Sequence, residues 1–518
     1  MSALASELSP SPVRRAAGGQ LSELIRARSS ALGAQSYVEH ARAERGLTFR
    51  DLEHAVEGWG DTLDEIGAAP GSTVGLVIAD PIEFSVAFLG TIASGRWAAP
   101  LDPGTPGPGL DVALGRVQAD VVFSDPPTPD GLRAQWVERE RTSSLGWSAG
   151  DGSGGAVLAS SGTTGVPKVI PLHQGRLLHT ARGVSDHLHL TPSDRGFNSL
   201  PLFHINAEVV GLLASLVAGS CLVLDDRFHR TRFWSLMAER RITWINAVPA
   251  IISRLATPDF DEVIPSRIRF IRSASAPLPV ATSARFEENT GIPVVETYGM
   301  TEAASQITAN PVTGVRKPGS VGLPVGVEVR VVVGESSAAG PPPPPEGAIG
   351  EVEIRGPAVI AAYAGEHHRD RIDPQGWLRT GDLGHFDEDG YLYLDSRTDD
   401  VINRGGEKVF PREIEELILA DSDVAGVAVI GSPDHELGQV PVAYIVLRGS
   451  EDGADADIEM AAHVTARLRD HLGAALVRTK RPVSLSVVRA LPAGATGKVQ
   501  RRFLRESDVP VIYHLDCR

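Results

Sequence analysis

The sequence predicts an α/β protein: a large N-terminal domain of helix-covered sheets with a β-rich subdomain, followed by a small α/β C-terminal domain. Apolar strands alternate with amphipathic helices up to about residue 300, which is typical of a parallel sheet covered by helices. Short β-rich runs separated by turns follow Gly319, and another alternation of helices and strands begins near residue 396. Because a chain of 518 residues is too long for one hydrophobic core, several domains are expected.

The first clear element is a helix that begins after Thr48. Thr48 and Asp51 form a capping pair at its start, and Gly67 stops it. A buried strand over 74–78, a helix from Pro81 to Gly95 and a strand over 97–101 continue the alternation. The apolar positions of the first helix recur at helical spacing: Leu52, Val56, Trp59, Leu63 and Ile66.

Composition divides the rest of the chain. Residues 1–20, rich in Ser, Pro, Ala and Gly, are predicted to be disordered, and residues 125–155 to be loop-like. A second α/β stretch is expected over 175–300, and the Pro341–Pro345 run is expected to be an exposed hairpin extension. The later predicted elements are strands over 327–333, 349–354 and 391–394, a helix over 411–419, strands over 424–430 and 440–447, a helix over 458–472 and a strand over 483–491.

Composition also excludes several functional classes. The formal net charge of −16 opposes nonspecific binding to nucleic acid or to an anionic membrane, so neither partner is expected. The longest uncharged stretch, Val209–Leu224, is broken by Gly219 and indicates a buried helix followed by a buried strand, with no membrane insertion. Since Cys221 and Cys517 are the only cysteines and no signal peptide is evident, we expect a soluble protein of the reducing cytoplasm.

The segment Ser160–Lys168 is the most informative motif. It combines hydroxyl groups, two glycines and a lysine, which suits a loop whose backbone N–H groups converge on phosphate oxygens. Its glycine spacing differs from the Walker pattern. A run of this kind is often only a flexible linker, but apolar segments on both sides predict a strand–loop–strand frame.

Several other motifs carry side chains suited to nucleotide chemistry. In the run Tyr298–Glu302 the Glu302 carboxylate is a candidate Mg²⁺ ligand, although a single glutamate after a turn is more often solvated. Asp382 follows a glycine turn and is placed to accept hydrogen bonds from two ribose hydroxyls. Arg397 suits a phosphate or ribose contact, and Lys498 lies in a glycine-rich segment near the C-terminus.

In this order the motifs resemble those of the acyl-adenylate-forming superfamily: acyl-CoA synthetases, adenylation domains of peptide synthetases and firefly-type luciferases. The resemblance extends from the helix after Thr48 to Lys498. It implies that a carboxylate attacks the α-phosphorus of ATP in the presence of Mg²⁺, giving an acyl-adenylate and pyrophosphate. The thiol of CoA, as co-substrate, then displaces AMP.

Within this family an acyl-CoA synthetase is the favoured function. The main alternative is an acyl-AMP ligase that transfers its product to a separate acyl carrier protein, since no carrier domain is evident in the chain. A catalytically silent binding protein is a further alternative, against which the retained Lys168, Glu302, Asp382 and Lys498 argue. Luciferase-like oxygenation also stays open.

The resemblance implies a role for each matching residue. Glu302 holds Mg²⁺, Thr301 touches the α-phosphate, and Lys498 contacts the carboxylate and the α-phosphate during adenylation. Asp382 binds the ribose with Arg397 nearby. The adenine is flanked by Ser275, Ala276, Pro277, Tyr298, Gly299 and Met300, and the phosphate loop consists of Ser160, Ser161, Gly162, Thr163, Thr164, Gly165 and Lys168. Val169 stands where a glycine is common in the family, so the exit of this loop is stiffer.

The C-terminal domain is implied to be mobile. By the resemblance, a large domain over 21–398 and a small domain over 399–518 meet at a hinge, Asp399. Rotation about this hinge after adenylation removes Lys498 and brings Gly405-Gly406 to the pantetheine channel. One active site thereby serves two reactions.

The resemblance also locates an acyl pocket. His204 lies at its mouth, where amino-acid-activating relatives carry an aspartate, so an amino acid is disfavoured. The remaining wall candidates are mainly small or apolar, which favours a hydrophobic carboxylic acid. They are Ile205, Ala207, Val209, Val248, Ala250, Ile251, Ala274 and Met300, with polarity from Glu208, Trp244 and Asn246. A Glu208 that faced the pocket would discourage a dicarboxylate.

Overall fold

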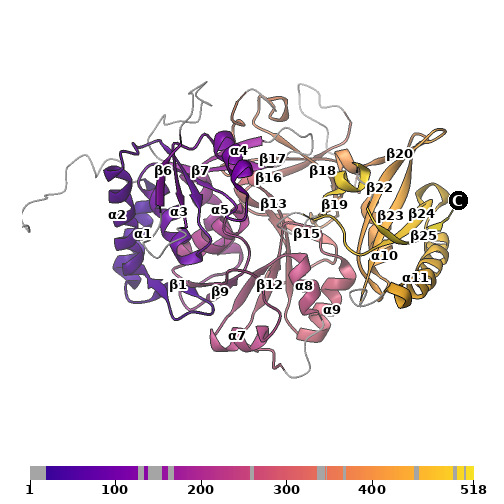
Figure 1. Ribbon diagram of the computed structural model, residues 1–518, viewed down its shortest axis with the longest axis horizontal. Helices are drawn as coiled ribbons and strands as arrows, with labels where there is room; N and C mark the ends of the chain where they lie inside the picture. The colour runs from indigo at the N-terminus through magenta and orange to yellow at the C-terminus, as the bar shows by residue number, and fades with distance from the viewer. Residues whose placement is uncertain are drawn as a thin grey trace, which may run out of the picture.

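The computed structural model describes residues 19–125, 133–137, 154–160, 168–256, 262–334, 345, 347–365, 369–448, 454–493, 499–506 and 509–517. They form a large N-terminal part and a smaller C-terminal module, which lie side by side (Figure 1). The large part contains two sheets with helices around them, and the module contains a third.

The first sheet holds the strand that precedes the predicted phosphate loop. Its central strands are parallel, as the alternation of strands and helices predicted, and β7 and β8 form an antiparallel pair on either side of residues 161–167. The expected strand–loop–strand frame is therefore confirmed in its two strands. In spatial order the sheet contains β6 (Arg133–Trp136), β5 (Val121–Ser124), β3 (Thr73–Val77), β4 (Trp97–Pro100), β7 (Gly155–Ser160) and β8 (Lys168–His173).

The second sheet joins a parallel half to a β-rich antiparallel half. Strand β13 is the junction, since it pairs parallel with β12 and antiparallel with β14. The parallel side continues through β12 (Phe270–Ser273), β11 (Trp244–Ala247), β9 (Arg195–Asn198), β10 (Cys221–Leu224) and β1 (Ser36–His40), with β2 (Gly46–Thr48) at the edge. The other side contains β13 (Val294–Met300), β14 (Ser305–Ala309), β15 (Ser320–Pro324), β19 (Leu392–Arg397), β18 (Leu378–Phe386), β17 (Gly350–Arg355) and β16 (Glu328–Val332).

Helices fill the space around these two sheets, and the largest buried cluster draws apolar side chains from helices and strands of both. The predicted helix after Thr48 is α2, and its capping box is present: Thr48 Oγ1 accepts from the Asp51 N–H at 3.1 Å, and Asp51 Oδ2 accepts from the Thr48 N–H at 3.0 Å. The helices are α1 (Gln20–Leu32), α2 (Phe49–Glu65), α3 (Pro81–Ala93), α4 (Gly107–Val117), α5 (Gln174–His187), the π-helix η2 (Ala207–Leu213), α6 (Ala214–Ala218), α7 (Phe233–Glu239), α8 (Pro249–Leu255) and α9 (Val280–Thr290).

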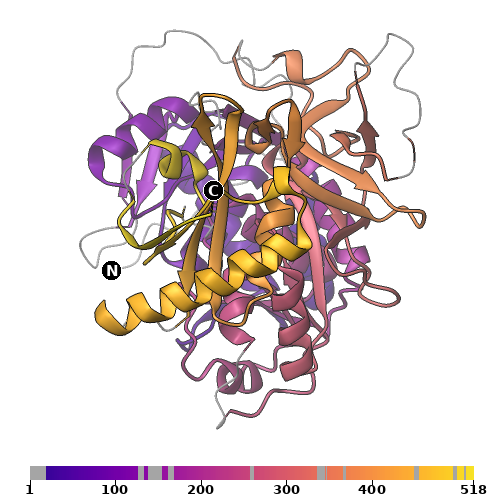
Figure 2. The same ribbon diagram turned by 90° about the vertical axis from the view of Figure 1, so that its right-hand side faces the viewer.

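The C-terminal module is a sheet covered by a long helix. Helix α11 (Ala454–Ala475) lies across this sheet (Figure 2) and shares a buried core with it. The short helix η5 (Thr398–Asp400), which contains the predicted hinge residue Asp399, connects β19 of the large sheet to β20 of the module. The other elements are β20 (Ile402–Arg404), β21 (Glu407–Val409), α10 (Pro411–Leu419), β22 (Val424–Asp434), β23 (Gly438–Leu447), β24 (Ser484–Val488), α12 (Arg501–Glu506) and β25 (Val511–Asp516).

Sequence patterns misplaced one element. The stretch 125–155 was expected to be loop-like, but β6 pairs antiparallel with β5 at the sheet edge, opposite Val121–Ser124. The prediction is wrong there because an edge strand needs only one buried neighbour, so its side chains give little apolar signal; Trp136 is half exposed. Within the segment 1–20, Gly19 is the N-cap of α1 and Gln20 is its first residue. Residues 1–18 lie outside the described residues. The proline run lies between the antiparallel strands β16 and β17, and within it only Pro345 is described.

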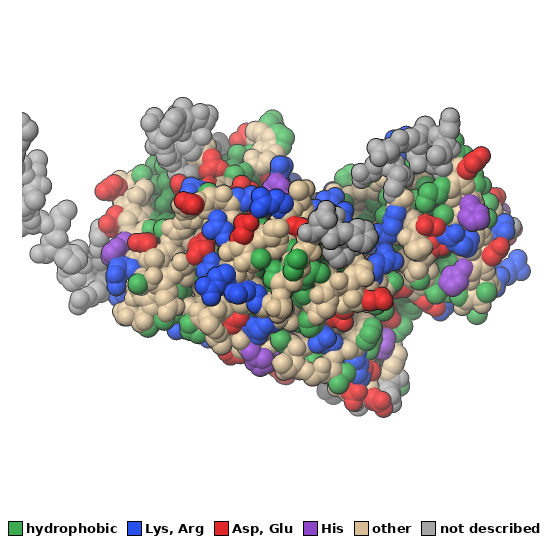
Figure 3. Space-filling view, turned by 90° about the horizontal axis from the view of Figure 1, so that it is seen from below, with side chains coloured by type: hydrophobic (Ala, Val, Ile, Leu, Met, Phe, Trp, Pro, Cys, Tyr) green, Lys and Arg blue, Asp and Glu red, His purple; other side chains and the backbone are tan. Residues whose placement is uncertain are grey.

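Charged side chains of both signs are interspersed over the face seen from below (Figure 3). Among the helices that the structure describes, none has the length and apolar composition needed to cross a membrane.

The α2 capping box gives a direct test of local stability. Thr48→Ala should lower the free energy of unfolding by about 1 kcal/mol, since it removes the side chain that accepts from the Asp51 N–H. Urea unfolding of Thr48→Ala, Asp51→Ala and the double variant measures it. A loss in the double variant that is smaller than the sum of the two single losses would show that the two bonds support each other; fully additive losses would contradict it.

Candidate active site

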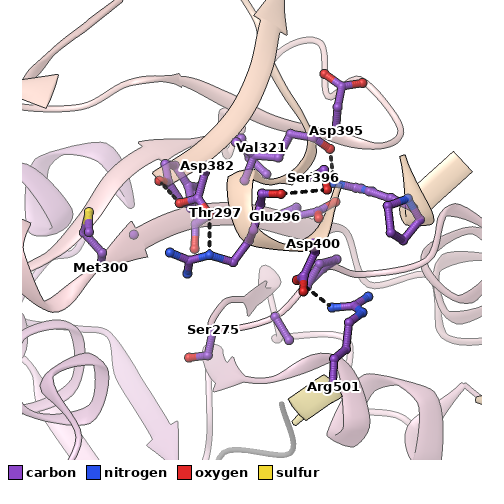
Figure 4. A pocket seen from close by; sticks show the side chains of 18 of the residues that line it. Ser275, Glu296, Thr297, Met300, Val321, Asp382, Asp395, Ser396, Asp400 and Arg501 are labelled. Carbon is purple, nitrogen blue, oxygen red and sulfur yellow. Dashed lines mark hydrogen bonds and ion pairs between the residues drawn. The ribbon is translucent and has the colours of Figure 1, made fainter. Parts of the chain in front are cut away.

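A cavity of about 350 Å³ lies where the parallel strands of the large sheet end and the C-terminal module begins. The carboxyl ends of parallel strands are the usual place for a ligand site in an α/β sheet. Here the segment after β12 supplies Ser275–Pro277, and the end of β13 supplies Tyr298–Met300. Figure 4 shows side chains from both parts of the protein converging on this cavity.

Many of the residues predicted for the nucleotide site line this one cavity. They are Lys168, Ser275, Ala276, Pro277, Tyr298, Gly299, Met300, Thr301, Glu302, Asp382 and Arg397. Although they come from distant parts of the sequence, the fold brings them together. Residues Ser161–Pro167 and Lys498 lie outside the described residues, as does the side chain of Ser160.

Sequence reasoning missed a second set of lining residues. Glu296 and Thr297 directly precede Tyr298 on strand β13, so the strand pattern could have revealed them. Asp395 and Ser396 precede Arg397 and could have been found in the same way. Val321 and Leu394 line it from the large sheet. The remaining residues come from the module or its connection and carry no local signal: Asp400, Pro411, Arg412, Glu415 and Arg501.

The cavity lining includes a cation beside a carboxylate. Lys168 Nζ, at the start of β8, lies 3.7 Å from Glu302 Oε1, and the Tyr363 hydroxyl donates to the same oxygen at 3.0 Å. Burial lowers the pKa of Lys168, while the neighbouring Glu302 carboxylate opposes that shift. The pair therefore presents a positive charge and a fixed carboxylate at the point where the sequence predicted phosphate binding.

Glu302 is compatible with Mg²⁺, which does not need a cage of protein ligands. Within the described residues, no group of three or more His, Cys, Asp or Glu side chains is placed to hold a metal ion. Mg²⁺ keeps several waters and commonly uses one or two carboxylates together with substrate phosphates. One carboxylate beside Lys168 meets that requirement.

The lining also includes a polar group suited to a sugar. The Tyr298 hydroxyl donates to Asp382 Oδ2, and Arg397 Nε lies 3.5 Å from Asp382 Oδ1. Burial and the Asp382 charge raise the pKa of Tyr298, so its phenol keeps its proton and acts as a donor. Because β18 and β19 pair Asp382 with Arg397 in register, the sheet itself sets this geometry.

The backbone of two residues that line the cavity, Gly299 and Ser275, is tightly constrained. A Cβ on Gly299 would lie 1.6 Å from the Ser305 carbonyl oxygen, so only glycine permits β14 to approach β13 here. Ser275 adopts a left-handed φ of 75°, which is uncommon for a residue with a side chain. Such conformations persist where the surrounding structure enforces them, and they are frequent at ligand sites.

The C-terminal module closes one side of the cavity. Arg501 donates to both Glu415 oxygens at 2.7 and 2.9 Å and lies 3.5 Å from Asp400 (Figure 4). Arg412 reaches back to the large part and donates to the Leu394 carbonyl at 2.7 Å. The cavity therefore includes groups that move with the module if the module moves.

The predicted acyl-pocket residues occupy the buried region next to this cavity. Met300 is the one that also lines the cavity; Ile205, Ala207, Val209, Val248 and Ala274 are buried in the protein core. His204 is mostly buried, and burial lowers its pKa, so it is neutral at pH 7. Glu208 is fully buried, and burial raises its pKa well above the usual range of a glutamate.

Sequence reasoning missed a polar cluster in the same region. Arg272 of β12 donates to Asn206 Oδ1 at 2.9 Å, to Asn246 Oδ1 at 3.1 Å and to Gln306 Oε1 at 3.2 Å. Burial lowers the pKa of Arg272 to about 9, so it stays charged at pH 7. Only Asn246 had been considered from the sequence, because an arginine inside a β-strand gives no local sign of what it contacts.

The predicted CoA and hinge residues lie outside the cavity lining. Gly405 and Gly406 both have positive φ, 59° and 90°, and form the turn between β20 and β21. Asp399 lies in η5, next to the cavity residue Asp400.

Glu296 makes the stability of this region depend on pH. Burial raises its pKa to about 7 from an ordinary 4.5. The folded state thus binds the proton more tightly than the unfolded chain, so this contribution is present below pH 4.5 and is lost as the pH rises through 7. Glu296→Gln should unfold with a free energy about 3 kcal/mol higher than wild type at pH 8, and similar to wild type at pH 4.5.

Denaturant titrations of wild type and Glu296→Gln across this pH range measure the difference. Glu288→Gln, at an exposed position on the preceding helix α9, is the control and should show no such pH dependence. A constant difference between Glu296→Gln and wild type at all pH values would contradict the assignment.

Comparison with known proteins identifies the family. The AMP-binding enzyme model matches residues 28–151 and 156–364, and the AMP-binding enzyme C-terminal domain model matches 413–498. The sulfoacetate–CoA ligase of Cupriavidus necator is 34% identical over 93% of this chain and 96% of its own length. The oxalate–CoA ligase of Arabidopsis thaliana is 32% identical over 89% and 93%.

Solved structures agree with this match. The o-succinylbenzoate CoA synthetase of Bacillus subtilis, in complex with its acyl-adenylate intermediate, superimposes with a TM-score of 0.78 at 25% identity over 94% of this chain and 98% of its own. The same enzyme has been solved with ATP and a magnesium ion. The resemblance seen in the motif order is confirmed: the chain belongs to the AMP-binding enzyme family, and it is an AMP-forming acyl-CoA synthetase.

Proposed function

We propose that the 350 Å³ cavity carries out both half-reactions of this synthetase, with ATP, Mg²⁺ and CoA. In the first, a carboxylate oxygen of the acid bonds to the α-phosphorus of ATP, the bond from that phosphorus to the bridging oxygen breaks, and pyrophosphate leaves. In the second, the sulfur of CoA bonds to the acyl carbon, AMP leaves, and the thiol proton passes to solvent. The carrying observation is that one cavity is lined by both the Lys168–Glu302 pair and the Tyr298–Asp382 pair.

The nucleotide would lie against both the Lys168–Glu302 pair and the Tyr298–Asp382 pair. Asp382 accepts hydrogen bonds from the ribose hydroxyls, and Tyr298 and Arg397 hold its carboxylate in place. Glu302 holds Mg²⁺, which supplies positive charge against the phosphates. Thr301 and Lys168, with the loop residues Thr163 and Thr164, bind the phosphate oxygens, while Ser275, Ala276 and Pro277 contact the adenine. The left-handed Ser275 supports this placement, since it fixes the backbone beside the base.

The module supplies the remaining groups. We place Lys498 against the carboxylate and the α-phosphate, where a cation stabilises charge that builds up as two anions are brought together. Its described neighbour Arg501 supports this, because Arg501 lines the cavity. His204 and the Gly405-Gly406 turn are proposed to border the acyl pocket and the pantetheine channel. The two free cysteines, Cys221 and Cys517, favour a reducing compartment, and we propose the cytoplasm.

The names of the relatives favour an acid with more than one charge. Sulfoacetate and oxalate, the acids named for two of them, each carry two anionic groups. The hydrophobic acid inferred from the sequence depended on apolar wall residues, which the structure places in the core around a polar cluster. We therefore propose a short acid with a second polar group.

Mass spectrometry of pooled carboxylic acids incubated with the enzyme, ATP and Mg²⁺, with and without CoA, tests the function. The expected products are acyl-AMP without CoA and acyl-CoA with it. Acyl-AMP that accumulates and does not react with CoA would instead point to a separate acyl carrier protein as acceptor. No adenylate from any acid would refute the proposal.

Lys498→Ala should lower the rate of adenylate formation by about 10²–10³-fold, because it removes one group that stabilises charge in the transition state. Thioester formation from preformed acyl-AMP and CoA should be largely retained. Single-turnover pyrophosphate release and thioester formation measure the two steps separately. Arg502→Ala, which removes an exposed positive charge nearby, is the control. Equal losses in both half-reactions would exclude the role assigned to Lys498.

Asp399→Pro should leave adenylate formation intact and block thioester formation, because proline fixes a backbone angle at the proposed hinge. Asp399→Ala keeps backbone freedom and should retain both half-reactions. The same two assays measure the effect. Normal thioester turnover by Asp399→Pro would show that the module does not rotate about this residue.

A further inference from the structure

Arg272 is a buried cation that the described part of the protein does not neutralise. It lies on β12 with 1% of its surface exposed. Its three hydrogen-bond acceptors are amide oxygens of Asn206, Asn246 and Gln306, and among the described residues no Asp or Glu forms an ion pair with it. Neutral amides orient the guanidinium but leave its charge in place.

Arg96 shows how the same fold treats another buried arginine. It is 2% exposed, and it forms an ion pair with Asp64 while donating to the Ala68 carbonyl at 2.7 Å. An uncompensated buried charge is costly, because removal from water is not balanced by a partner. Among the described residues Arg272 has no such counter-ion, so we look for the balancing anion outside this part of the protein.

Two buried donors in the cluster point to the same conclusion. Arg272 Nε and Gln306 Nε2 are buried and have no hydrogen-bond partner among the described residues. Buried donors are nearly always satisfied in native proteins. The missing partner of these two donors is an acceptor, and the charge of Arg272, which neutral amides leave in place, favours an anionic one.

The cluster is adjacent to the catalytic cavity. Asn206 Nδ2 donates to Ser275 Oγ at 3.4 Å, and Ser275 lines the cavity. Gln306 is paired with Gly299 across β14 and β13, and Gly299 also lines it. Arg272 is therefore separated from the cavity by a single layer of side chains, on the side where the predicted acyl-pocket residues lie.

The sheet aligns these groups. Asn198, Asn246 and Arg272 are in register on the adjacent parallel strands β9, β11 and β12, so they share one face of the sheet. Asn246 Nδ2 donates to Asn198 Oδ1 at 2.9 Å, which fixes the Asn246 oxygen toward Arg272. Helix η2 covers this face: a Cβ on Gly211 would lie 3.9 Å from Asn198.

We infer that Arg272, oriented by Asn206, Asn246 and Gln306, binds a second anionic group of the acid, so that the substrate is a short carboxylic acid with a carboxylate or sulfonate at its far end. The acid is short because only one layer of side chains separates Arg272 from the cavity. Glu208 carries no ion pair among the described residues, and burial raises its pKa well above the usual range, which disfavours the charge that would oppose such a substrate. The inference rests on the proposed function, since it assumes that the reacting carboxylate lies in the cavity.

Matched acids test it. Succinate and succinamate, or malonate and malonamate, differ only in whether the far group is charged. With the full-length enzyme, ATP, Mg²⁺ and CoA, kcat/KM for the charged acid should exceed that for its amide by about 10²-fold or more, since a site built for a polar group strongly rejects an analogue that lacks it. Arg272→Met should bring this ratio close to one, and Arg272→Lys should restore part of it.

Gln306→Glu is the sharper variant, because it keeps the shape of the side chain and replaces an amide nitrogen that makes no hydrogen bond. The new carboxylate would lie about where Gln306 Oε1 lies, 3.2 Å from Arg272 Nη2. It should raise Tm without substrate, abolish the Tm increase caused by succinate, and lower the selectivity ratio as Arg272→Met does. Arg96→Met is the control for loss of a buried arginine: it should lower Tm and leave the ratio as in wild type.

The outcomes separate this inference from the function itself. A ratio near one in wild type, or a ratio that survives both Arg272→Met and Gln306→Glu, overturns the inference, while acyl-CoA formed from any acid still supports the synthetase. A Tm increase that chloride alone reproduces also overturns it, because the balancing anion would then be a resident inorganic ion. If no acid yields acyl-AMP, the proposed function fails. The inference is then decided by Tm alone: succinate should raise the Tm of wild type more than succinamate does, and Gln306→Glu should abolish that increase.

Discussion

The close approach of β14 to β13 at Gly299 is the constraint on which the site depends. A side chain there would collide with the Ser305 carbonyl, so glycine permits the parallel and antiparallel halves of the large sheet to join. That junction places Tyr298 opposite Asp382 of β18 and leaves Thr301 and Glu302 at the strand end beside Lys168. One strand thus sets the position of both polar pairs in the cavity.

Sequence patterns predicted the order of the elements better than the composition of the site. Helices and buried strands follow from the spacing of apolar residues, and the capping box of α2 could be read from Thr48 and Asp51 alone. The edge strand β6 could not, because an edge strand has one neighbour and needs little apolar surface. Among site residues, those in motifs were found, whereas Arg412, Glu415 and Arg501 contribute through the position of the module, which no local pattern encodes.

The polar cluster shows a second limit of sequence reasoning. Asn206, Arg272 and Gln306 come from three separate segments, and each by itself looks like an ordinary polar residue. Only their contacts show that the acceptors of Arg272 are neutral amides, and no single segment of the sequence reveals those contacts. The apolar residues near His204 were visible in the sequence and suggested a hydrophobic acid; the charge among them became visible only when β9, β11 and β12 were placed in register.

Arg272 also bears on how such an enzyme changes during evolution. Specificity is often altered through surface loops, which accept substitutions with little effect on folding. Here the selecting charge is in a central strand, bonded to amides from neighbouring elements, so a change of preferred acid alters the core at the same time. Descendants with a new substrate would be expected to carry coordinated replacements at several of these positions, because residues that share hydrogen bonds do not vary independently.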